Sequence, residues 1–387
     1  MHVLFIPSWY KTPDRPLHGV FFEEQARALM KRGIQVGVFF PEIEMRFISR
    51  IKGKKTIPED FDDRSLPTLY HFTTSIVPRS RRLNYFFLCL TSDIKFKRYI
   101  LKYGKPDILH AHSVFSGGIV AKYLSKKYKI PYVITEHYSG LVAKDMANIP
   151  YNIKVSKLVY ENARMSMAVS RSFADSLVSK YSLRTDQMIV VPNLVNELFF
   201  AKLPTTPKRE MLVLFANSFL NANKNIKLIL DSFRLLLNRI GSATLYIGGD
   251  GDQMEYLKSY CNDLSLGGNV VFLGLLDRNQ VKEYLDRCDI FLSTSFYETF
   301  GIALIEALAC GKPVVSTNSG GPRDIIGPED GLLIDSFDPV DFYQGVMHIC
   351  QHYSQYNSDV IRKRCADRFS ESEVTSKLIQ IYQSSAK

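Results

Sequence analysis

The feature that most constrains the fold is a repeated alternation of short apolar runs with segments of helical periodicity. In the first half of the chain, apolar runs occur at 3–6, 34–40, 107–112, 132–137, 166–170 and 188–191. They are continuous rather than alternating, which is typical of parallel strands that are covered by helices on both faces. The first half therefore predicts an α/β domain with a parallel sheet.

The same alternation starts again in the second half. Strands are predicted at 211–216, 243–247, 269–273, 289–293 and 313–316, and helices at 226–238, 252–259, 279–286 and 302–309. A Pro- and Thr-containing stretch at 203–207 separates the halves and indicates a linker. We expect two Rossmann-like, doubly wound domains, 1–200 and 208–370, that face each other across a cleft. Ligands of such sheets bind at the carboxyl ends of the strands.

Composition and cysteine usage narrow the class of protein. The chain is 46% hydrophobic and 23% charged, as in soluble globular proteins, and no apolar run approaches the ~20 residues of a membrane-spanning helix. The N-terminus lacks a signal peptide's basic start and cleavage site, so we expect a cytoplasmic protein whose mature chain begins here. Six scattered cysteines predict neither a disulfide framework nor a zinc site.

Charge is distributed unevenly along the chain. Residues 1–200 hold 30 Lys and Arg against 17 Asp and Glu, a net charge of +13, whereas the remainder has a net charge of −3. The first half is therefore expected to prefer an anionic surface such as phosphate, lipid headgroups or nucleic acid.

The most specific motif is a pair of glutamates, Glu298 and Glu306, with seven residues between them. Glu298 follows a predicted strand, and Phe300, Gly301 and Ile302 then open a helix, so their backbone N–H groups are suited to binding a phosphate. Glu306 lies two turns further along, where a carboxylate can accept hydrogen bonds from two ribose hydroxyls. Two isolated glutamates would more often be solvated surface charges, but this context disfavours that interpretation.

This segment and several others resemble the retaining glycosyltransferases of family GT4, which have the GT-B fold. The resemblance spans nearly the whole chain. It rests on the first strand with its glycine-containing loop (6–10 and 19–21), the T-E-H segment 135–137, V-P-N at 191–193, G-G-D-G at 248–251, the glutamate pair, and G-G-P-R-D at 320–324. In this family the C-terminal helix crosses back onto the first domain, which implies that course for 371–387. The sequence alone equally allows this helix to cap the second domain.

The resemblance also implies roles for individual residues. Glu298 would contact the hydroxyls of the transferred sugar, the amides of 300–302 the distal phosphate, and Glu306 the ribose. Lys224 would neutralise the diphosphate. His137 and the backbone at Gly19, with His112 nearby, would border the sugar and the acceptor. The family needs no metal or other cofactor, and no Asp-x-Asp motif suggests one here.

One departure from the family pattern concerns the diphosphate. The family usually has an Arg just after the first strand of the second domain, but this chain has Asn217, Ser218 and Phe219 there. Phosphate neutralisation is expected to rest on Lys224 with help from Asn217 or Ser218, or on Arg323.

Together these features predict a metal-independent, retaining hexosyltransferase. It would transfer a hexose from a nucleotide diphosphate sugar, such as a UDP- or GDP-hexose, to a growing and lipid-linked glycan. A nucleotide-sugar epimerase of the same architecture is one alternative. A non-enzymatic, basic nucleic-acid-binding protein is another, although no nucleic-acid-reading motif is present.

A final expectation concerns the membrane. Between residues 64 and 129 there are 13 Lys and Arg and only two acidic residues, and the apolar stretch 85–90 lies between basic groups that include Arg81, Arg82, Lys97 and Arg98. An apolar patch bordered by cations is typical of a segment that lies in a membrane interface. We therefore expect the first domain to dock on the inner face of the cell membrane; the alternative is a core helix with a solvated basic face.

Overall fold

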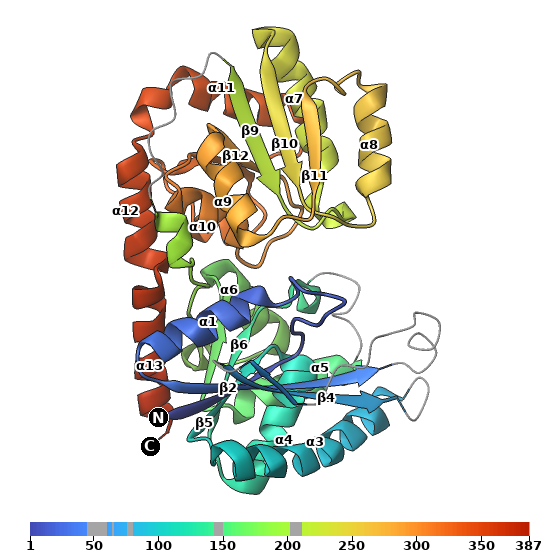
Figure 1. The fold of residues 1–387 in the computed structure, drawn as a ribbon, viewed down its shortest axis with the longest axis vertical. Coiled ribbons are helices and arrows are strands. Elements are labelled where there is room, and N and C mark those ends of the chain that lie inside the picture. The colour runs from blue at the N-terminus through green and yellow to red at the C-terminus, as the bar shows by residue number, and fades with distance from the viewer. Residues whose placement is uncertain (45–59, 64–65, 76–79, 143–149, 202–210, 387) are drawn as a thin grey trace. The chain divides into compact units, whose positions relative to one another are not determined.

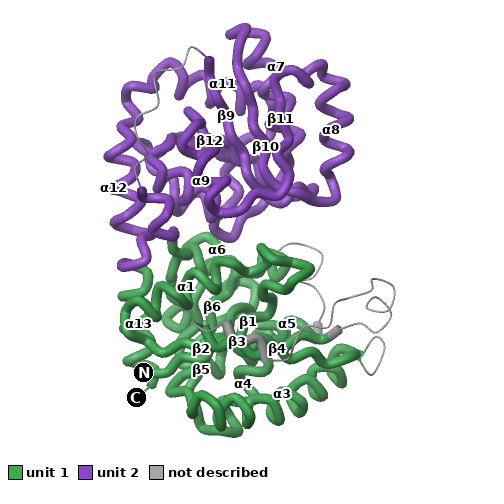
Figure 2. The backbone as a smooth tube through the Cα atoms, in the orientation of Figure 1, with its two compact units in different colours: residues 1–194, 374–387 green, residues 195–373 purple. Residues whose placement is uncertain are grey.

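A computed structural model describes residues 1–44, 60–63, 66–75, 80–142, 150–201 and 211–386. The linker expected at 203–207 lies outside the described residues. The chain divides into two compact units, which Figure 2 colours separately. The first contains residues 1–194 and 374–387, and the second contains 195–373. The first unit therefore ends at residue 194 rather than at the expected 200.

The first unit is built on an eight-stranded sheet of order β3-β4-β2-β1-β5-β6-β7-β8. All neighbouring strands pair in parallel except β3, which is antiparallel to β4. The strands are β1 (His2–Pro7), β2 (Gln35–Glu44), β3 (Asp60–Asp63), β4 (Leu66–Thr74), β5 (Ile108–His112), β6 (Tyr132–Glu136), β7 (Met165–Ala168) and β8 (Met188–Val190). The apolar runs had predicted six of these strands but not β3 and β4.

Helices connect these strands, as expected for repeated β-α units (Figure 1). They are α1 (Val20–Lys31), α3 (Arg81–Tyr103), α4 (Ile119–Tyr128), α5 (Pro150–Asn162) and α6 (Arg171–Tyr181). Among the described residues, no helix combines the length and the apolar character needed to cross a membrane.

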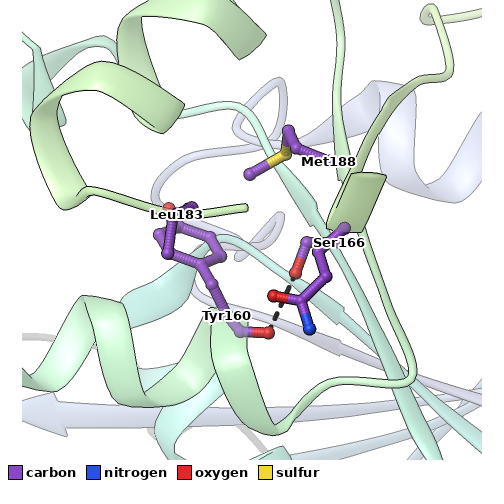
Figure 3. A pocket seen from close by; sticks show the side chains of 5 residues that line it. Tyr160, Ser166, Leu183 and Met188 are labelled. Atoms are coloured by element: carbon purple, nitrogen blue, oxygen red, sulfur yellow. Dashed lines mark hydrogen bonds between the residues drawn. The ribbon is translucent and has the colours of Figure 1, made fainter. Parts of the chain in front are cut away.

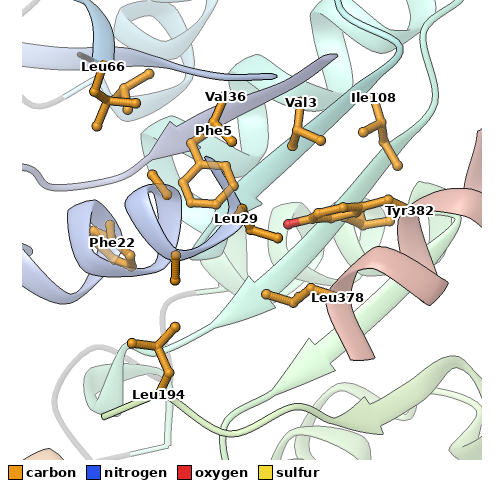
Figure 4. Packing of buried hydrophobic residues seen from close by; sticks show 14 of the residues in the cluster. Val3, Phe5, Phe22, Leu29, Val36, Leu66, Ile108, Leu194, Leu378 and Tyr382 are labelled. Atoms are coloured by element: carbon orange, nitrogen blue, oxygen red, sulfur yellow. The ribbon is translucent and has the colours of Figure 1, made fainter. Parts of the chain in front are cut away.

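The last helix, α13 (Glu371–Ser385), contributes to the core of the first unit. Val374, Leu378 and Tyr382 are fully buried and recur every four residues, so they form one apolar stripe along the helix. Figure 4 shows Tyr382 near Val3 and Ile108 of the central strands, and Leu378 belongs to the same buried cluster. The end of the chain is thus part of the same core as its beginning.

The second unit has a fully parallel six-stranded sheet of order β11-β10-β9-β12-β13-β14. Its strands are β9 (Leu212–Asn217), β10 (Ala243–Gly248), β11 (Val270–Gly274), β12 (Ile290–Ser293), β13 (Val314–Thr317) and β14 (Gly331–Ile334). Its helices are α7 (Ile226–Ile240), α8 (Met254–Asp263), α9 (Arg278–Arg287), α10 (Ile302–Ala309), α11 (Pro339–Gln351) and α12 (Ser358–Phe369). In both sheets the strand order runs outward from a central strand, first to one side and then to the other. This is the doubly wound topology that the sequence predicts.

Candidate active site

In the second unit, the predicted donor residues gather at the carboxyl edge of the sheet. Glu298 lies between β12 and α10, and Lys224 lies in a short turn between β9 and α7. The loop that carries Glu298 is fixed by backbone pairing, since its N–H donates to the Ser319 carbonyl at 2.8 Å and its carbonyl accepts from the Gly321 N–H at 2.9 Å. The start of α10 is therefore positioned by the loop that follows β13.

The first turn of α10 has the geometry expected of an anion-binding site. Gly301 precedes the helix with φ of 117°, a conformation that side chains other than glycine rarely adopt. Within the described residues, no acceptor is paired with the amides of Phe300, Gly301 and Ile302. These N–H groups lie at the positive end of the helix dipole, so they are available to a phosphate.

Lys224 and Glu298 form an ion pair between Nζ and Oε1. Both side chains are about four-fifths buried, with 21% and 17% of their surfaces exposed. The Ser295 hydroxyl also donates to Glu298 Oε1, at 3.0 Å. Without a ligand, the two residues predicted to bind diphosphate and sugar thus neutralise each other.

Glu306 forms a second ion pair, which the sequence did not predict. Its side chain is 3% exposed, and its Oε1 accepts a hydrogen bond from Arg278 Nη1. The guanidinium carbon of Arg278 also lies 4.7 Å from the centre of the Phe199 ring. Burial of an unpaired carboxylate is costly, so Arg278 compensates the charge of Glu306.

The position of the missing Arg is occupied by small polar groups. The Ser218 hydroxyl is buried, and within the described part of the chain no partner satisfies it. A Cβ at Gly249, whose φ is 117°, would lie 1.8 Å from the Ser218 carbonyl oxygen, so the two loops pack backbone to backbone. Asn217 ends β9 at the same edge, whereas the exposed Arg323 donates to Asn318 Oδ1 at 3.2 Å.

In the first unit, the predicted residues also lie at the carboxyl edge of the sheet. Gly19 precedes α1 with φ of 78°, and a Cβ there would meet the Trp9 carbonyl and the Phe22 ring. His112 ends β5 and His137 follows β6. Both histidines are buried against Phe22, with ring centres 4.6 and 5.1 Å from it.

The two histidines at this edge, and a third inside β5, are hydrogen-bonded. His112 Nδ1 lies 3.2 Å from His137 Nε2, and His110 Nδ1 lies 2.6 Å from the Tyr382 hydroxyl of α13. Burial lowers the pKa of His110 and of His137 to about 3, and it lowers the pKa of His112 well below its usual range. All three imidazoles are therefore neutral at pH 7. The described residues contain no group of His, Cys, Asp and Glu arranged to hold a metal ion.

A buried carboxylate orders the loops of this edge. Glu136, which precedes His137, accepts hydrogen bonds from the amides of Val114, His137 and Tyr138, each at 2.9 Å. The Tyr160 hydroxyl donates to it at 2.8 Å. Glu136 thereby fixes the backbone on both sides of His137.

A nearby pocket, shown in Figure 3, is lined by Tyr160, Ser166, Leu183, Gln187 and Met188 and has no room for a water molecule.

The predicted membrane segment is part of α3, and only some of it faces solvent. Leu88 is fully buried, and Tyr85 and Phe87 are half-buried, which corrects the expectation of an exposed apolar stretch at 85–90. The exposed apolar residues instead recur at helical spacing along the outer side of α3: Leu83, Phe86, Leu90, Ile94 and Leu101. We call this set the outer stripe of α3. Arg81, Arg82, Lys97 and Arg98 are exposed on the same helix.

Comparison with known proteins identifies the family. Residues 198–361 match the family described as Glycosyl transferases group 1, and residues 18–197 match Glycosyltransferase Family 4. The chain is 25% identical over 293 residues to a phosphatidylinositol N-acetylglucosaminyltransferase subunit of Arabidopsis thaliana, covering 75% of this chain and 64% of that protein. It is 24% identical over 235 residues to alpha-monoglucosyldiacylglycerol synthase of Streptococcus pneumoniae, covering 56% of this chain and 53% of that protein.

Solved structures show the same fold. HepE from Anabaena, solved in complex with UDP, superposes with a TM-score of 0.74 at 17% identity and covers 99% of this chain and all of that one. The two Rossmann-like sheets found here are those of GT-B glycosyltransferases. The chain therefore belongs to the group 1, family 4 glycosyltransferases and has their GT-B fold.

Proposed function

We propose that the chain is a retaining hexosyltransferase that uses a nucleotide diphosphate hexose and elongates a lipid-linked glycan. The observation that carries this proposal is the carboxyl edge of the second unit. Along this edge lie the Lys224–Glu298 pair, the buried Glu306 and the amides of 300–302, for which the described part of the chain offers no acceptor. These groups are suited to a diphosphate, a sugar and a ribose.

In the proposed reaction, the bound donor separates the Lys224–Glu298 ion pair, and each of the two residues then binds a part of the donor. Lys224 and the first-turn amides of α10 bind the diphosphate, which gains negative charge as the bond to the sugar breaks. Glu298, released from Lys224, accepts hydrogen bonds from the sugar hydroxyls. Glu306 accepts hydrogen bonds from the ribose hydroxyls.

Retention requires that the acceptor hydroxyl attack on the face that the diphosphate leaves, and the leaving phosphate oxygen then takes the acceptor proton. We propose that Lys224 and the amides supply the charge stabilisation that a metal provides in other transferases. Asn217 and the Ser218 hydroxyl, which has no partner among the described residues, add neutral hydrogen-bonding groups where the family pattern implies an Arg.

The edge of the first unit is proposed to bind uncharged sugar groups. His137 and His112 are neutral, and a neutral imidazole both donates and accepts hydrogen bonds, which suits hydroxyl groups. Gly19 brings the backbone close because no side chain fits there.

A ligand screen followed by a transfer assay tests the function. UDP, GDP and ADP, free and as hexose conjugates, are added while the melting temperature is recorded, because a ligand of the native state raises it. One nucleotide is expected to stabilise the chain. NMR of the anomeric proton then reports whether the product keeps the donor's configuration.

Two outcomes would replace the proposal. Conversion of the donor sugar without any acceptor would indicate an epimerase. Salt-sensitive binding of nucleic acid without any stabilisation by nucleotide sugars would indicate a nucleic-acid-binding protein.

We propose that the outer stripe of α3 docks the enzyme on an anionic membrane surface, where a lipid-linked acceptor lies. Phe86 and Ile94 are 56% and 57% exposed and Leu101 is 88% exposed. Burying such side chains in the interface yields about 1.5–3 kcal/mol each. Each nearby Lys or Arg adds about 1 kcal/mol on anionic lipid, so a few groups of each kind suffice for reversible binding. Two relatives whose names include a lipid are consistent with this proposal.

Co-sedimentation with vesicles tests the docking. Binding is expected to vesicles that contain phosphatidylglycerol, to fall with salt, and to weaken in Phe86→Ser with Ile94→Ser. Changing Arg81, Arg82, Lys97 and Arg98 to Glu should have the same effect. Lys363→Glu, on an exposed lysine of α12, is the control. Equal recovery with neutral and anionic vesicles would contradict the proposal.

A further inference from the structure

Arg278 occupies a defined position at the carboxyl edge of the second sheet. It is the first residue of α9, and its backbone is fixed by a capping box in which Asp277 Oδ1 accepts from the Gln280 amide at 2.9 Å and Gln280 Oε1 accepts from the Asp277 amide at 2.9 Å. Reciprocal caps of this kind order a helix start. The side chain of Arg278 therefore leaves the backbone from an ordered point.

The guanidinium of Arg278 is held between a charge and a ring. Nη1 donates to Glu306 Oε1, while the guanidinium carbon lies over the Phe199 ring. The two side chains of the ion pair differ in exposure, with 29% for Arg278 and 3% for Glu306. Of the two partners, Arg278 is thus the one that solvent reaches.

The ring beneath Arg278 is itself fixed. Phe199 is fully buried in a short helix, Glu197–Phe200, that is bonded to the end of α10. Cys310 Sγ lies 3.5 Å from the Phe199 carbonyl oxygen, and Arg362 donates to the carbonyls of Phe200 and Cys310 at 3.1 and 3.2 Å. Cys310 directly follows the helix that carries Glu306, so the ring and the carboxylate belong to two segments that are joined by these contacts.

We propose that Arg278 is a positioning residue for the donor: it compensates the charge of the buried Glu306 and orients the carboxylate toward the ribose hydroxyls. The proposal rests on the ribose role of Glu306 in the proposed function. A carboxylate has about four acceptor sites. Within the described residues, Arg278 is the one donor to this carboxylate, and it uses Oε1. Oε2 and the second lone pair of Oε1 are then left for the two hydroxyls of a ribose, without breakage of the ion pair.

The experiment measures binding of UDP and GDP, and of their 2′,3′-dideoxy analogues, by calorimetry. The wild-type chain should bind its preferred ribonucleotide at least about tenfold more tightly than the dideoxy analogue, since hydrogen bonds to a charged group are lost. Arg278→Ala should weaken binding of the ribonucleotide about tenfold and leave binding of the dideoxy analogue unchanged. A purely structural role would weaken both equally.

Further variants keep the test decisive. Arg278→Lys should retain part of the preference for ribose, and Arg278→Gln provides a second loss of charge if the alanine variant unfolds. Arg287→Ala, on the last residue of the same helix and paired with Glu283, should retain the full preference.

The outcomes separate this inference from the proposed function. If the wild-type chain prefers ribose and Arg278→Ala does so equally, Arg278 does not position Glu306. If the wild-type chain binds the ribonucleotide and its dideoxy analogue equally tightly, Glu306 does not bind ribose. The donor assignment of the proposed function then fails together with the inference.

Discussion

The carboxyl edges of the two sheets differ in charge: ion pairs lie at the edge of the second unit, and mainly neutral side chains lie at the edge of the first. The second unit has two ion pairs at its edge, Lys224–Glu298 and Arg278–Glu306. The cation of each pair is partly exposed, with 21% for Lys224 and 29% for Arg278. In the first unit the polar groups are neutral histidines and one carboxylate, Glu136, which the backbone and a tyrosine fully satisfy.

This difference suggests how the work of the enzyme is divided. Ion pairs that lie near solvent can exchange partners with a charged ligand, and a nucleotide diphosphate brings such charges. Neutral imidazoles bind hydroxyl groups without a charge to compensate. We therefore propose that the second unit binds the donor and that the first unit binds uncharged sugar groups, and each prediction below tests one part of this proposal.

The largest effect is expected at Lys224. Lys224→Ala removes the cation that is proposed to bind the diphosphate and leaves Glu298 without its ion-pair partner, so transfer should fall at least about 100-fold, as when one oxyanion-stabilising group is removed. Added Mg²⁺ should not restore it. Lys227→Ala, which removes a lysine one turn further along that is paired with Asp231, is the matched control. Near-normal transfer by Lys224→Ala would show that another residue carries the phosphate charge.

The two glutamates should separate in their kinetic effects. Glu298→Ala is expected mainly to lower kcat, and Glu306→Ala mainly to raise the KM for the donor. Each loses hydrogen bonds to a charged group, about 1.5–3 kcal/mol or roughly 10- to 150-fold. Steady-state kinetics with limiting donor measures the split, and Glu255→Ala, at a surface position of α8, is the control. Wild-type kinetics in both variants would remove these residues from the site.

A smaller effect concerns the pH dependence of stability in the first unit. His110 and His137 have pKa values near 3 in the folded chain because they are buried, against about 6.5 when unfolded. Between these values the unfolded chain binds more protons, so the free energy of unfolding falls as pH falls below 6.5, by about 2 kcal/mol per histidine at pH 5. Burial raises the pKa of Glu136, so this carboxyl makes the free energy of unfolding rise as pH falls. This effect opposes that of the histidines, but it comes from a single group.

Urea unfolding at pH 7, 6 and 5 measures this slope. His110→Gln should flatten it, whereas the exposed His348→Gln should leave it unchanged. An unchanged slope in His110→Gln would mean that His110 is not held neutral by burial.

The arrangement of Glu298 and Glu306 around the start of α10 was predictable from sequence because its signals are local. Glu298, the start of α10 and Glu306 lie within nine residues, so helix geometry alone relates them. Arg278 was missed because its partner is 28 residues away. A signal was present in the capping-box pattern Asp277-x-x-Gln280, which starts a helix just after a predicted strand and therefore at this edge.

The first unit was less predictable because its determinants are long-range. The hydrogen bond between Tyr382 and His110 joins residues 272 positions apart, and no local pattern indicates it. β4 begins Leu66-Pro67 and mixes buried with half-buried positions, so it lacks the continuous apolar run that identified the other strands. In α3, the apolar residues at 85–90 divide between the buried face and the outer stripe, a division that depends on which side meets the sheet.

Hydrogen–deuterium exchange with and without a nucleoside diphosphate tests the central claim most directly. The nucleotide that stabilises the chain should slow exchange at 217–225 and at 298–306, where Lys224, the first-turn amides of α10 and Glu306 lie. Without a sugar or acceptor, exchange around His112 and His137 should change less. Protection confined to the first unit, with none around the start of α10, would contradict the assignment of the donor to the second unit.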